Sequence, residues 1–271
     1  MPELPEVETV RKSLEKWCAG KSIKDIDIFY PRVLENIGFD EFKSKVVNQT
    51  INEIGRFGKY LFLILDDYVI ISHLRMEGKY FFVENEDEYI RKHKIITFKF
   101  GKENLIYHDV RKFGKMKLVK KDSYMKDESI SKLGKEPFTI TPHELYNKLH
   151  HMNKKVKQCL LDQSVISGLG NIYVDEVLFD SSIHPLRNSK DISLKECENI
   201  IDSSIRILNK AIELKGSTIA TYHFNNNESG GFQNEHKVYG KKGCKCSRCN
   251  TIIEKTTVAG RGTYYCSECQ K

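Results

Sequence analysis

The chain begins Met-Pro-Glu-Leu-Pro-Glu, which places a proline and a carboxylate where they can do covalent chemistry. Removal of Met1 would leave Pro2 with a free secondary amine, and an α-amino group titrates near ~8, below the ~10 of lysine. Such an amine can attack a sugar carbon and form an iminium, which acidifies the neighbouring carbon and permits elimination. Glu3 follows directly and can donate or accept the proton. The alternative is that Pro2 only leads into an amphipathic helix with Pro5 at its first position.

The last 28 residues contain five of the eight cysteines. Two pairs with matching spacing, Cys246 with Cys249 and Cys266 with Cys269, are separated by sixteen residues. Four thiolates in two such pairs form a closed tetrahedral Zn²⁺ site, which is structural rather than catalytic. Cys244 competes with Cys246 for this assignment, but the two-residue spacing favours Cys246. The alternative is four buried thiols without a metal.

Two glycine-containing segments have the composition of phosphate-binding sites. The sequence Ala-Gly-Arg-Gly-Thr places Arg261 between two glycines, where its guanidinium can approach phosphate oxygens with little obstruction. Gly168 and Gly170 precede a predicted helix that begins at Asn171; free N–H groups there favour an anion, and the Asn171 side chain can add a donor. The alternatives are a solvated arginine at a turn and an ordinary connection between two helices.

Two further segments, residues 73–78 and 107–114, combine basic and apolar side chains with a final glycine. A thin apolar side chain such as Met76 or Phe113 can insert into a base stack, and Arg111 can fill the space left by an extruded base. Methionine and phenylalanine are more often core residues, which is the alternative. Their position on turn-like segments beside Gly78 and Gly114 weakens that default.

The composition indicates a polyanionic partner. The chain has 271 residues, 30% of them charged, a formal net charge of +7 and a pI near 8.8. Residues 240–271 contain seven basic and two acidic side chains, so most of the excess charge lies in the tail. The acidic start is unlike a secretory signal, and the longest apolar run, residues 60–65, is far below the ~20 residues of a membrane span. We therefore expect a soluble intracellular protein of two domains.

Short β-branched and aromatic segments in the first half predict an antiparallel sandwich or barrel. The expected strands are residues 22–30, 59–65, 68–73, 79–84, 94–100, 104–107 and 115–120, with a helix over 40–47. After a linker within 129–141, the pattern is helical. The expected helices are residues 142–150, 154–162, 171–179 and 194–214, the last with a capping box of Ser193 and Glu196 and an end at Gly216.

Taken together, these segments resemble the formamidopyrimidine-DNA glycosylase family of bacterial enzymes, which excise oxidised purines such as 8-oxoguanine. The resemblance covers essentially the whole chain and depends on the joint occurrence of its motifs in this order. The motifs are Pro-Glu-Leu-Pro-Glu-Val-Glu at the start, residues 58–61, 73–78, 109–114, 168–176, 231–233 and 238–240, and the four-cysteine segment.

The resemblance implies a catalytic set of Pro2, Glu3, Lys59 and Arg261, with Glu6 as a supporting carboxylate. Pro2 is then the nucleophile that forms the iminium, and Glu3 is the general acid for ring opening. Lys59 binds phosphate near the lesion, and its ammonium would disfavour protonation of the Pro2 amine. Successive β- and δ-eliminations cut the strand. The implied cofactor is one structural Zn²⁺ held by the four paired cysteines.

The resemblance also implies a DNA-binding set and a lesion-recognition set. Met76, Arg111 and Phe113 would form the insertion triad, while His73, Asn171 and Arg261 would grip the DNA backbone. The lesion-recognition set is Glu77, Ser217, Thr221 and Tyr222. A carbonyl at Ser217 could distinguish an 8-oxopurine, which carries an N–H where guanine has a lone pair.

Ala220 and the segment 224–231 depart from the family pattern and put the fine lesion preference in doubt. An endonuclease VIII-type relative, which prefers oxidised pyrimidines, commonly begins Pro-Glu-Gly-Pro-Glu; Leu4 and the intact triad favour the purine enzyme. A second rival is a DNA-binding module without catalysis, which the presence of Pro2, Glu3 and Lys59 disfavours.

The resemblance implies an α+β multidomain fold. We expect an N-terminal antiparallel β-sandwich domain with flanking helices (1–132), a linker (133–145), a helical DNA-binding domain with a helix–two-turn–helix motif (146–237) and a zinc-ribbon β-hairpin (238–271). The expected partner is double-stranded DNA containing oxidised purines, with no membrane association. We expect a monomer in the bacterial cytoplasm, associated with the nucleoid.

Overall fold

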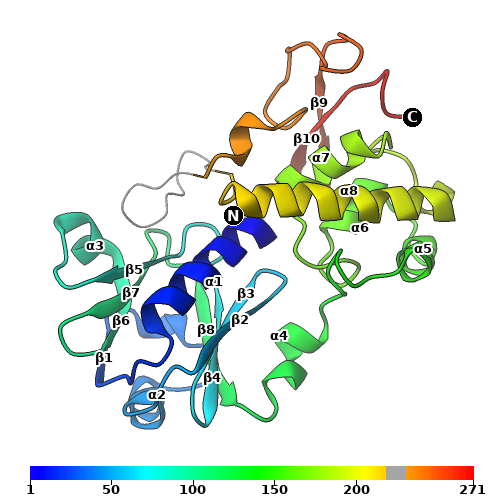
Figure 1. Cartoon of the computed structure of the whole chain (residues 1–271). Helices are drawn as coiled ribbons and strands as arrows, with labels where there is room; N and C mark the ends of the chain where they lie inside the picture. Colours follow the sequence, from blue (N-terminus) through cyan, green and yellow to red (C-terminus); the bar gives the residue numbers. More distant parts are fainter. Residues whose placement is uncertain (218–229) are drawn as a thin grey trace. The chain divides into compact units, whose positions relative to one another are not determined.

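The structure is a computed structural model that describes residues 1–217 and 230–271. The described chain divides into two compact units, the first formed by Met1–Ser131 and the second by Lys132–Ser217 with Gly231–Lys271 (Figure 1). Within the described residues, none of the helices combines the length and the apolar character that crossing a lipid bilayer requires.

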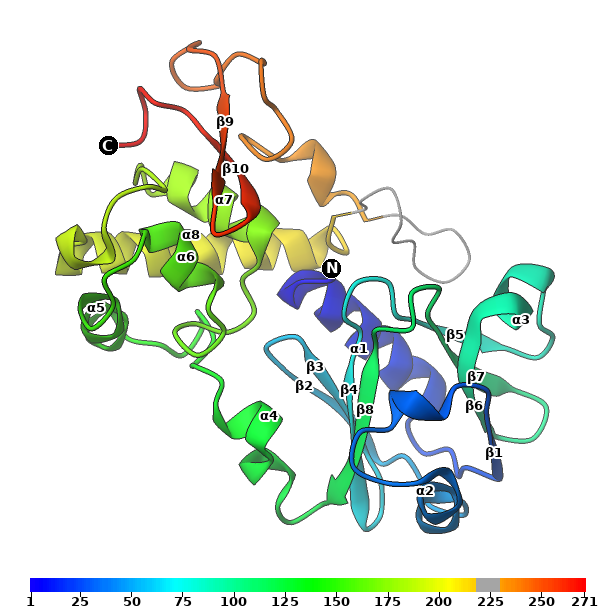
Figure 2. The same cartoon turned by 180° about the vertical axis from the view of Figure 1, so that it is seen from behind.

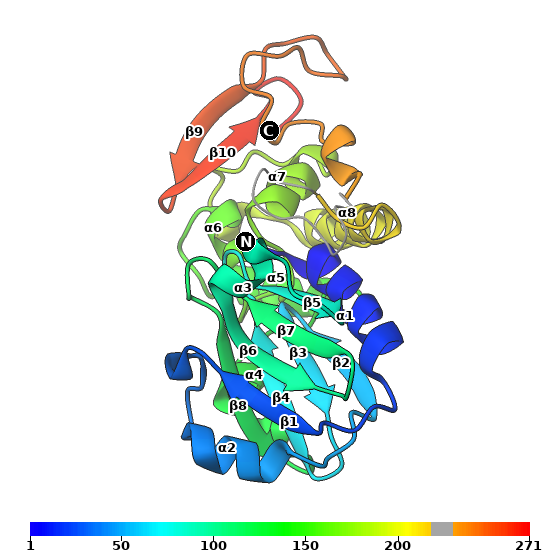
Figure 3. The ribbon, with the colours of Figure 1, turned by 90° about the vertical axis from the view of Figure 1, so that its left-hand side faces the viewer.

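The first unit is an antiparallel β-sandwich of two four-stranded sheets (Figure 3). One sheet has the order β1-β6-β7-β5, with β1 Asp25–Ile28, β6 Lys94–Lys99, β7 Asn104–His108 and β5 Lys79–Val83. The other has the order β2-β3-β4-β8, with β2 Glu53–Phe57, β3 Tyr60–Ile64, β4 Tyr68–His73 and β8 Lys115–Lys120. Buried side chains from both sheets form one hydrophobic core, as two packed sheets require.

Four helices accompany the sandwich: α1 Leu4–Cys18, α2 Phe39–Val46, α3 Glu88–His93 and α4 Glu128–Ser131. Helix α1 buries Val7, Val10 and Leu14 in the same core. These residues follow the three- and four-residue spacing of one helix face. The start of the chain is thereby fixed against the sandwich.

Two loops cross from one sheet to the other at the same end of the sandwich. The 73–78 loop joins β4 to β5, and the 109–114 loop joins β7 to β8. Strands β4 and β8 are neighbours with His73 opposite Lys115, and β5 and β7 are neighbours with Lys79 opposite His108. The two loops therefore run side by side (Figure 2).

The second unit contains the helices α5 Pro142–His150, α6 Val156–Leu161, α7 Asn171–Asp180 and α8 Leu194–Glu213 (Figure 1). In α7 every residue from Ile172 to Phe179 is buried, which is typical of a helix enclosed on all sides. Two of these residues, Asp175 and Glu176, are acidic and must therefore be bound within the unit. Helix α8 begins with the predicted capping box of Ser193 and Glu196.

The unit ends in a hairpin of β9 Glu254–Val258 and β10 Arg261–Tyr265 (Figure 3). Its two-residue turn has positive φ at both Ala259 (48°) and Gly260 (73°), the type I′ geometry that suits strand twist. Arg261 follows this turn directly and is exposed. A small hydrophobic cluster of Phe179, Val238, Cys246, Ile253 and Cys266 joins the base of this segment to α7.

The sandwich and the helical segment confirm the fold expected from the sequence, with differences in detail. Strand β2 was not expected, and the strand predicted over 22–30 is reduced to Asp25–Ile28. Helix α1 begins at Leu4, so Pro5 is its second residue rather than its first. Proline is tolerated at the second position of α1 because the N–H groups of the first turn have no partner within the helix. Helix α3 was also not expected.

Glu176 provides a test of how the second unit is held together. Its buried carboxylate accepts the main-chain N–H groups of Lys237 (2.8 Å), Val238 (3.0 Å) and Tyr239 (2.8 Å). We expect Glu176→Ala to leave these groups unbound, at a cost of about 1–3 kcal/mol each. Hydrogen exchange measured by mass spectrometry should therefore become at least ~10-fold faster at residues 237–239. Glu213→Ala, at an exposed position, should leave their exchange unchanged; equal protection in both variants would contradict the anchor.

Candidate active site and metal centre

The N-terminus of the first unit is fixed by two buried glutamates. Glu3 is the N-cap of α1, and its main-chain N–H donates to Oε2 of Glu6 at 2.8 Å, as part of a capping box. Pro2 is buried and Met1 is exposed. The predicted nucleophile and general acid therefore stand at a rigid helix start, and Glu6 supports the main chain of Glu3.

An ion pair links α1 to the turn that carries Lys59. The guanidinium of Arg56 donates from Nε to Oε2 of Glu8 on α1 at 2.9 Å, and from Nη1 to the Gly58 carbonyl at 3.0 Å. Gly58 and Lys59 form the two-residue turn between β2 and β3, and only Gly58 has a positive φ (56°). This is the pattern of a type II′ turn. Lys59, which is buried, thus takes its position from the helix that begins beside Pro2.

His73 lies at the end of β4, opposite Tyr60 in the sheet register, and is buried. Burial, with the charges of Arg75 and Lys59, lowers the pKa of His73 from 6.5 to about 3. The N–H of Arg75 donates to Nδ1 of His73 at 2.9 Å, which assigns the ring proton to Nε2. His73 is therefore a neutral ring whose Nε2–H can donate a hydrogen bond near Lys59.

The two side-by-side loops carry the predicted insertion triad. Phe113 is 50% exposed, which places it among the most exposed large apolar side chains of the described residues. The Arg111 guanidinium carbon lies 4.8 Å from the centroid of the Phe113 ring, within the range of a cation–π contact. Met76 and Glu77 are half-buried on the neighbouring loop. The structure therefore brings Met76, Arg111 and Phe113 to one end of the sandwich.

Asp109 holds the 109–114 loop in its shape. Its fully buried carboxylate accepts the N–H of Arg111 at 2.9 Å and the N–H of Gly114 at 2.7 Å. Sequence reasoning assigned no role to this residue. The signal was present, because an aspartate at the start of a turn commonly binds the main chain two residues later.

In the second unit, Asn171 is the first residue of α7 and follows the N-cap Gly170. Gln163 shapes the preceding segment: its Oε1 accepts the Gly168 N–H at 3.0 Å and its Nε2 donates to the Leu169 carbonyl at 2.8 Å. Gly168 has a positive φ of 97°, which glycine adopts without steric cost. These bonds place Asn171 at the positive end of the helix dipole.

The Gly262 carbonyl connects Asn171 to the hairpin that carries Arg261. It accepts hydrogen bonds from Nδ2 of Asn171 at 3.0 Å and from Nζ of Lys157 at 3.1 Å. Lys157 also pairs with Asp175 at 2.7 Å, and the second oxygen of Asp175 accepts the Tyr264 N–H at 3.0 Å. Burial raises the pKa of Asp175 to about 7, against the effect of the Lys157 ammonium. Sequence reasoning missed this pair, because nothing in a local pattern shows that Lys157 is buried.

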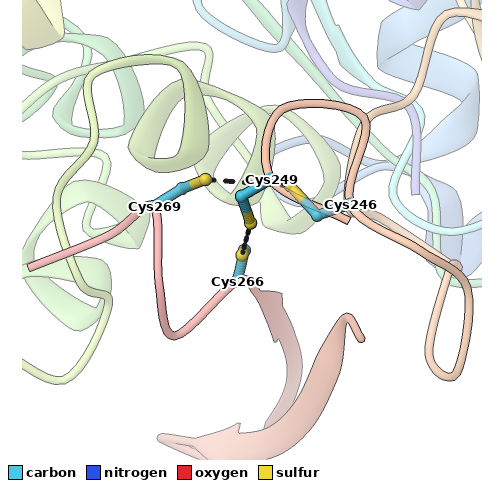
Figure 4. A group of neighbouring side chains, drawn as sticks. All are labelled: Cys246, Cys249, Cys266 and Cys269. Atoms are coloured by element: carbon cyan, nitrogen blue, oxygen red, sulfur yellow. Dashed lines mark hydrogen bonds between the residues drawn. The ribbon is translucent and has the colours of Figure 1, made fainter. Parts of the chain in front are cut away.

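The four paired cysteines converge at the base of the hairpin (Figure 4). The Sγ atoms of Cys246, Cys249, Cys266 and Cys269 all lie within 4.8 Å of one another. A tetrahedral Zn²⁺ with Zn–S bonds of about 2.3 Å requires S···S separations of about 3.8 Å. The Cys246–Cys269 and Cys249–Cys266 separations are 3.8 Å and 3.4 Å, so the donor set fits the ion. Cys244 is exposed and lies outside the cluster.

The predicted lesion-recognition residues are only partly described. Ser217 is buried, and its hydroxyl lies 3.1 Å from Nε2 of His236. Thr221 and Tyr222, with Ala220, lie outside the described residues. The geometry thus groups the N-terminal residues, Lys59, His73 and the triad within the first unit, and Asn171, Arg261 and the cysteines within the second.

Three family models match this chain in order. The N-terminal domain of formamidopyrimidine-DNA glycosylase matches residues 1–116, its H2TH domain matches 133–223, and a zinc finger found in FPG and IleRS matches 243–271. Formamidopyrimidine-DNA glycosylase of Bacillus anthracis is 48% identical over 275 residues, which cover 100% of this chain and 99% of that protein.

Solved structures of similar sequence share the fold. The Lactococcus lactis Fpg complex with DNA containing an abasic site has a TM-score of 0.91 at 44% identity, with 100% of both chains covered. A MutM complex with DNA containing carbocyclic 8-oxo-G has a TM-score of 0.90 at 44% identity, also with 100% of both chains covered.

The lowered pKa of His73 predicts a pH dependence of stability. Its folded pKa of about 3 lies below the unfolded value near ~6.5, so on acidification the unfolded chain takes up this proton first. The contribution of His73 to the free energy of unfolding should therefore fall by about 2 kcal/mol between pH 7 and pH 5. The fluorescence of Trp17, the one tryptophan of the chain, reports unfolding of the first unit in denaturant titrations. The free energy of unfolding of His73→Gln should depend less steeply on pH than that of the wild-type chain. Equal slopes for the two chains would mean that the folded His73 ring accepts the proton.

Proposed function

The chain belongs to the formamidopyrimidine-DNA glycosylase family, and we propose that it excises oxidised purines from duplex DNA through a covalent Pro2 intermediate. It is a DNA repair enzyme of the glycosylase and AP lyase type. The observation that carries the finer proposal is the N-terminal arrangement. There, Pro2 and Glu3 begin a helix held by Glu6, and Arg56 links that helix to the Lys59 turn.

After removal of Met1, the Pro2 amine attacks C1′ of the damaged nucleotide, and the glycosidic bond breaks as its electrons leave with the base. The amine proton passes to the departing base, Glu3 donates a proton to the ring oxygen O4′ as the C1′–O4′ bond breaks, and the opened sugar becomes an iminium. We assign to the buried Lys59 ammonium the role of keeping this amine unprotonated, because a neighbouring positive charge disfavours its protonation.

The iminium then makes elimination possible. Loss of a proton from C2′ breaks the C3′–O bond and releases the 3′ phosphate by β-elimination. Loss of a proton from C4′ then breaks the C5′–O bond and releases the 5′ phosphate by δ-elimination. The positive iminium nitrogen receives the electrons at each stage, so this sequence follows from a secondary amine as nucleophile.

DNA binding is assigned to groups of both units. Phe113 and Met76 would enter the base stack and Arg111 would fill the space of the extruded nucleotide, which is consistent with the exposure of Phe113. The Nε2–H of His73, the amide of Asn171 and the guanidinium of Arg261 would donate to phosphate oxygens. Lys59 completes this set through its charge.

For lesion recognition we propose Ser217, Thr221, Tyr222 and Glu77. Ser217 is buried at the start of the segment 217–222, where a carbonyl can accept the N7–H of an 8-oxopurine. Guanine offers a lone pair at that position, so the same carbonyl would disfavour it. Similar proteins solved in complex with DNA that contains carbocyclic 8-oxo-G or an abasic site support this substrate class.

We further propose one structural Zn²⁺ held by Cys246, Cys249, Cys266 and Cys269. The ion would fix the segment from which the hairpin projects, and therefore the position of Arg261. The proposed domains are residues 1–132, 133–145, 146–237 and 238–271. The proposed working form is a monomer in the bacterial cytoplasm, bound to the nucleoid.

Borohydride trapping tests the covalent step directly. We expect a duplex with one 8-oxoguanine opposite cytosine to yield a reduced adduct that peptide mass spectrometry maps to Pro2. Pro2→Gly should lower strand cleavage by about two orders of magnitude or more, because the nucleophile is changed, while binding to the damaged duplex persists.

Other outcomes of the trapping experiment would support other functions. Tight binding without any adduct would support the DNA-binding module without catalysis. An adduct on an oxidised pyrimidine but not on 8-oxoguanine would support an endonuclease VIII-type enzyme. An adduct that maps to a lysine would overturn Pro2 as nucleophile while leaving the glycosylase assignment intact.

The cysteine pairs offer a matched test of the metal site. Cys249→Ala should reduce zinc from about one ion per chain to almost none, as measured by inductively coupled plasma mass spectrometry, because a closed site requires all four thiolates. Cys244→Ala should keep the ion, since Cys244 lies outside the cluster. Weakened DNA binding in Cys249→Ala alone would connect the ion to Arg261. Retention of zinc by Cys249→Ala would show that the ligands are wrongly assigned.

A further inference from the structure

Tyr107 lies beneath the two loops that carry the insertion triad. It is in β7, opposite Tyr80 of β5, and it is fully buried. The two rings contact each other with centroids 5.1 Å apart, and the Tyr80 hydroxyl donates to the Ser72 hydroxyl at 2.8 Å. The phenol of Tyr107 is thus held by the strands from which both loops emerge.

The Tyr107 hydroxyl occupies the space in which two glycines would otherwise carry side chains. A β-carbon at Gly78, the last residue of the 73–78 loop, would lie 2.2 Å from this oxygen. A β-carbon at Gly114, the last residue of the 109–114 loop, would lie 1.6 Å from the same oxygen. One hydroxyl group therefore contacts the ends of both loops.

Space, rather than backbone conformation, explains glycine at these positions. Neither Gly78 nor Gly114 has a positive φ, so an alanine could adopt the same main-chain geometry. At Gly38 of the same unit, by contrast, a β-carbon would meet nothing within 4 Å. Gly78 and Gly114 thus allow both loops to close onto the Tyr107 phenol.

Both loops also contain a residue in an unfavourable conformation beside the triad. Arg75, which precedes Met76, has φ = 54°, and Lys112, between Arg111 and Phe113, has φ = 57°. Non-glycine residues adopt this left-handed region only when surrounding contacts maintain it. The contacts that hold these loops include the Asp109 hydrogen bonds, the bond from the Arg75 N–H to Nδ1 of His73, and the Tyr107 phenol.

We propose that Tyr107 is a positioning residue that sets the spacing of the two loops, so that Met76, Arg111 and Phe113 enter the duplex as one unit. This inference rests on the proposed function, because it concerns how the triad extrudes a damaged base. It makes Tyr107 necessary for the step that opens the base stack. It gives Tyr107 no part in the chemistry at Pro2.

Two substrates distinguish the opening of the base stack from the chemistry at Pro2. Excision of 8-oxoguanine from a duplex requires insertion, whereas cleavage at a preformed abasic site in a single strand presents no stack to open. We expect Gly114→Ala to lower the single-turnover rate on the duplex by about tenfold or more, since small misplacements of positioning groups have large effects. Its rate on the single strand should stay within about twofold of the wild-type rate. Gly38→Ala is the matched control and should leave both rates unchanged.

Tyr107→Phe is the second variant of this experiment. Alone, it removes the hydroxyl without creating a clash and should lower only the duplex rate, by severalfold. Combined with Gly114→Ala, it should restore part of that rate, because the severe clash with the oxygen at 1.6 Å is replaced by a smaller one with Cζ at 2.7 Å. Trp17 fluorescence would show whether each variant folds, and Tyr107→Phe decides the question if the alanine variants do not.

Failure of the proposed role of Tyr107 and failure of the proposed function would give different results. A wild-type chain that is active on both substrates, with every variant keeping the wild-type ratio of rates, would overturn the role of Tyr107 alone. Equal losses on both substrates would also overturn it, since they would indicate general damage to the fold. A wild-type chain that forms no Pro2 adduct would overturn the proposed function itself.

Discussion

Buried carboxylates that accept main-chain N–H groups hold the functional segments of this protein in place. Glu6 binds the residue after Pro2, Asp109 binds the 109–114 loop, Asp175 binds the hairpin, and Glu176 binds the chain that leads into the zinc finger. Burying an ionised carboxylate costs several kcal/mol, and each charge-assisted hydrogen bond offsets about 1.5–3 kcal/mol of that cost. The acceptors are therefore satisfied only when their segments are in position, which links the order of each segment to the stability of its unit.

The sequence was most informative where periodicity and turn residues agree. The strands at 68–73 and 115–120 and the helix at 142–150 have the predicted bounds. Strand β2 was missed because Glu-Ile-Gly-Arg-Phe shows weak alternation and a central glycine, and it forms through pairing with β3. Tertiary pairing of this kind decides strands whose own pattern is ambiguous.

The candidate site also contains residues that a local pattern identifies and residues that it does not. The residues that we expect to touch DNA or zinc could be named from the sequence because their types and spacing suit a particular chemistry, as with the cysteine pairs, which the structure brings together. The residues that position them were not identifiable. Lys157 and Asp175 are 18 residues apart, and Tyr107 resembles any core tyrosine until the two glycines above it are located. Positioning depends on contacts between distant segments, which a local pattern does not contain.

Asn171 shows how such a contact can prepare a binding group. Its Oδ1 is buried without a hydrogen-bond partner among the described residues, while its Nδ2 donates to the Gly262 carbonyl. Turning the amide over would direct Oδ1 at that carbonyl, so Gly262 fixes which end of the amide faces it. An amide nitrogen has two N–H bonds, and among residues 1–217 and 230–271 one of them is used, by the Gly262 carbonyl. The second can donate to an anion. The carbonyl bound by the first belongs to Gly262, the residue after Arg261 within strand β10. One acceptor thus sets the orientation of Asn171 and the anchorage of the residue beside Arg261, and it connects a helix start and a hairpin that are far apart in sequence.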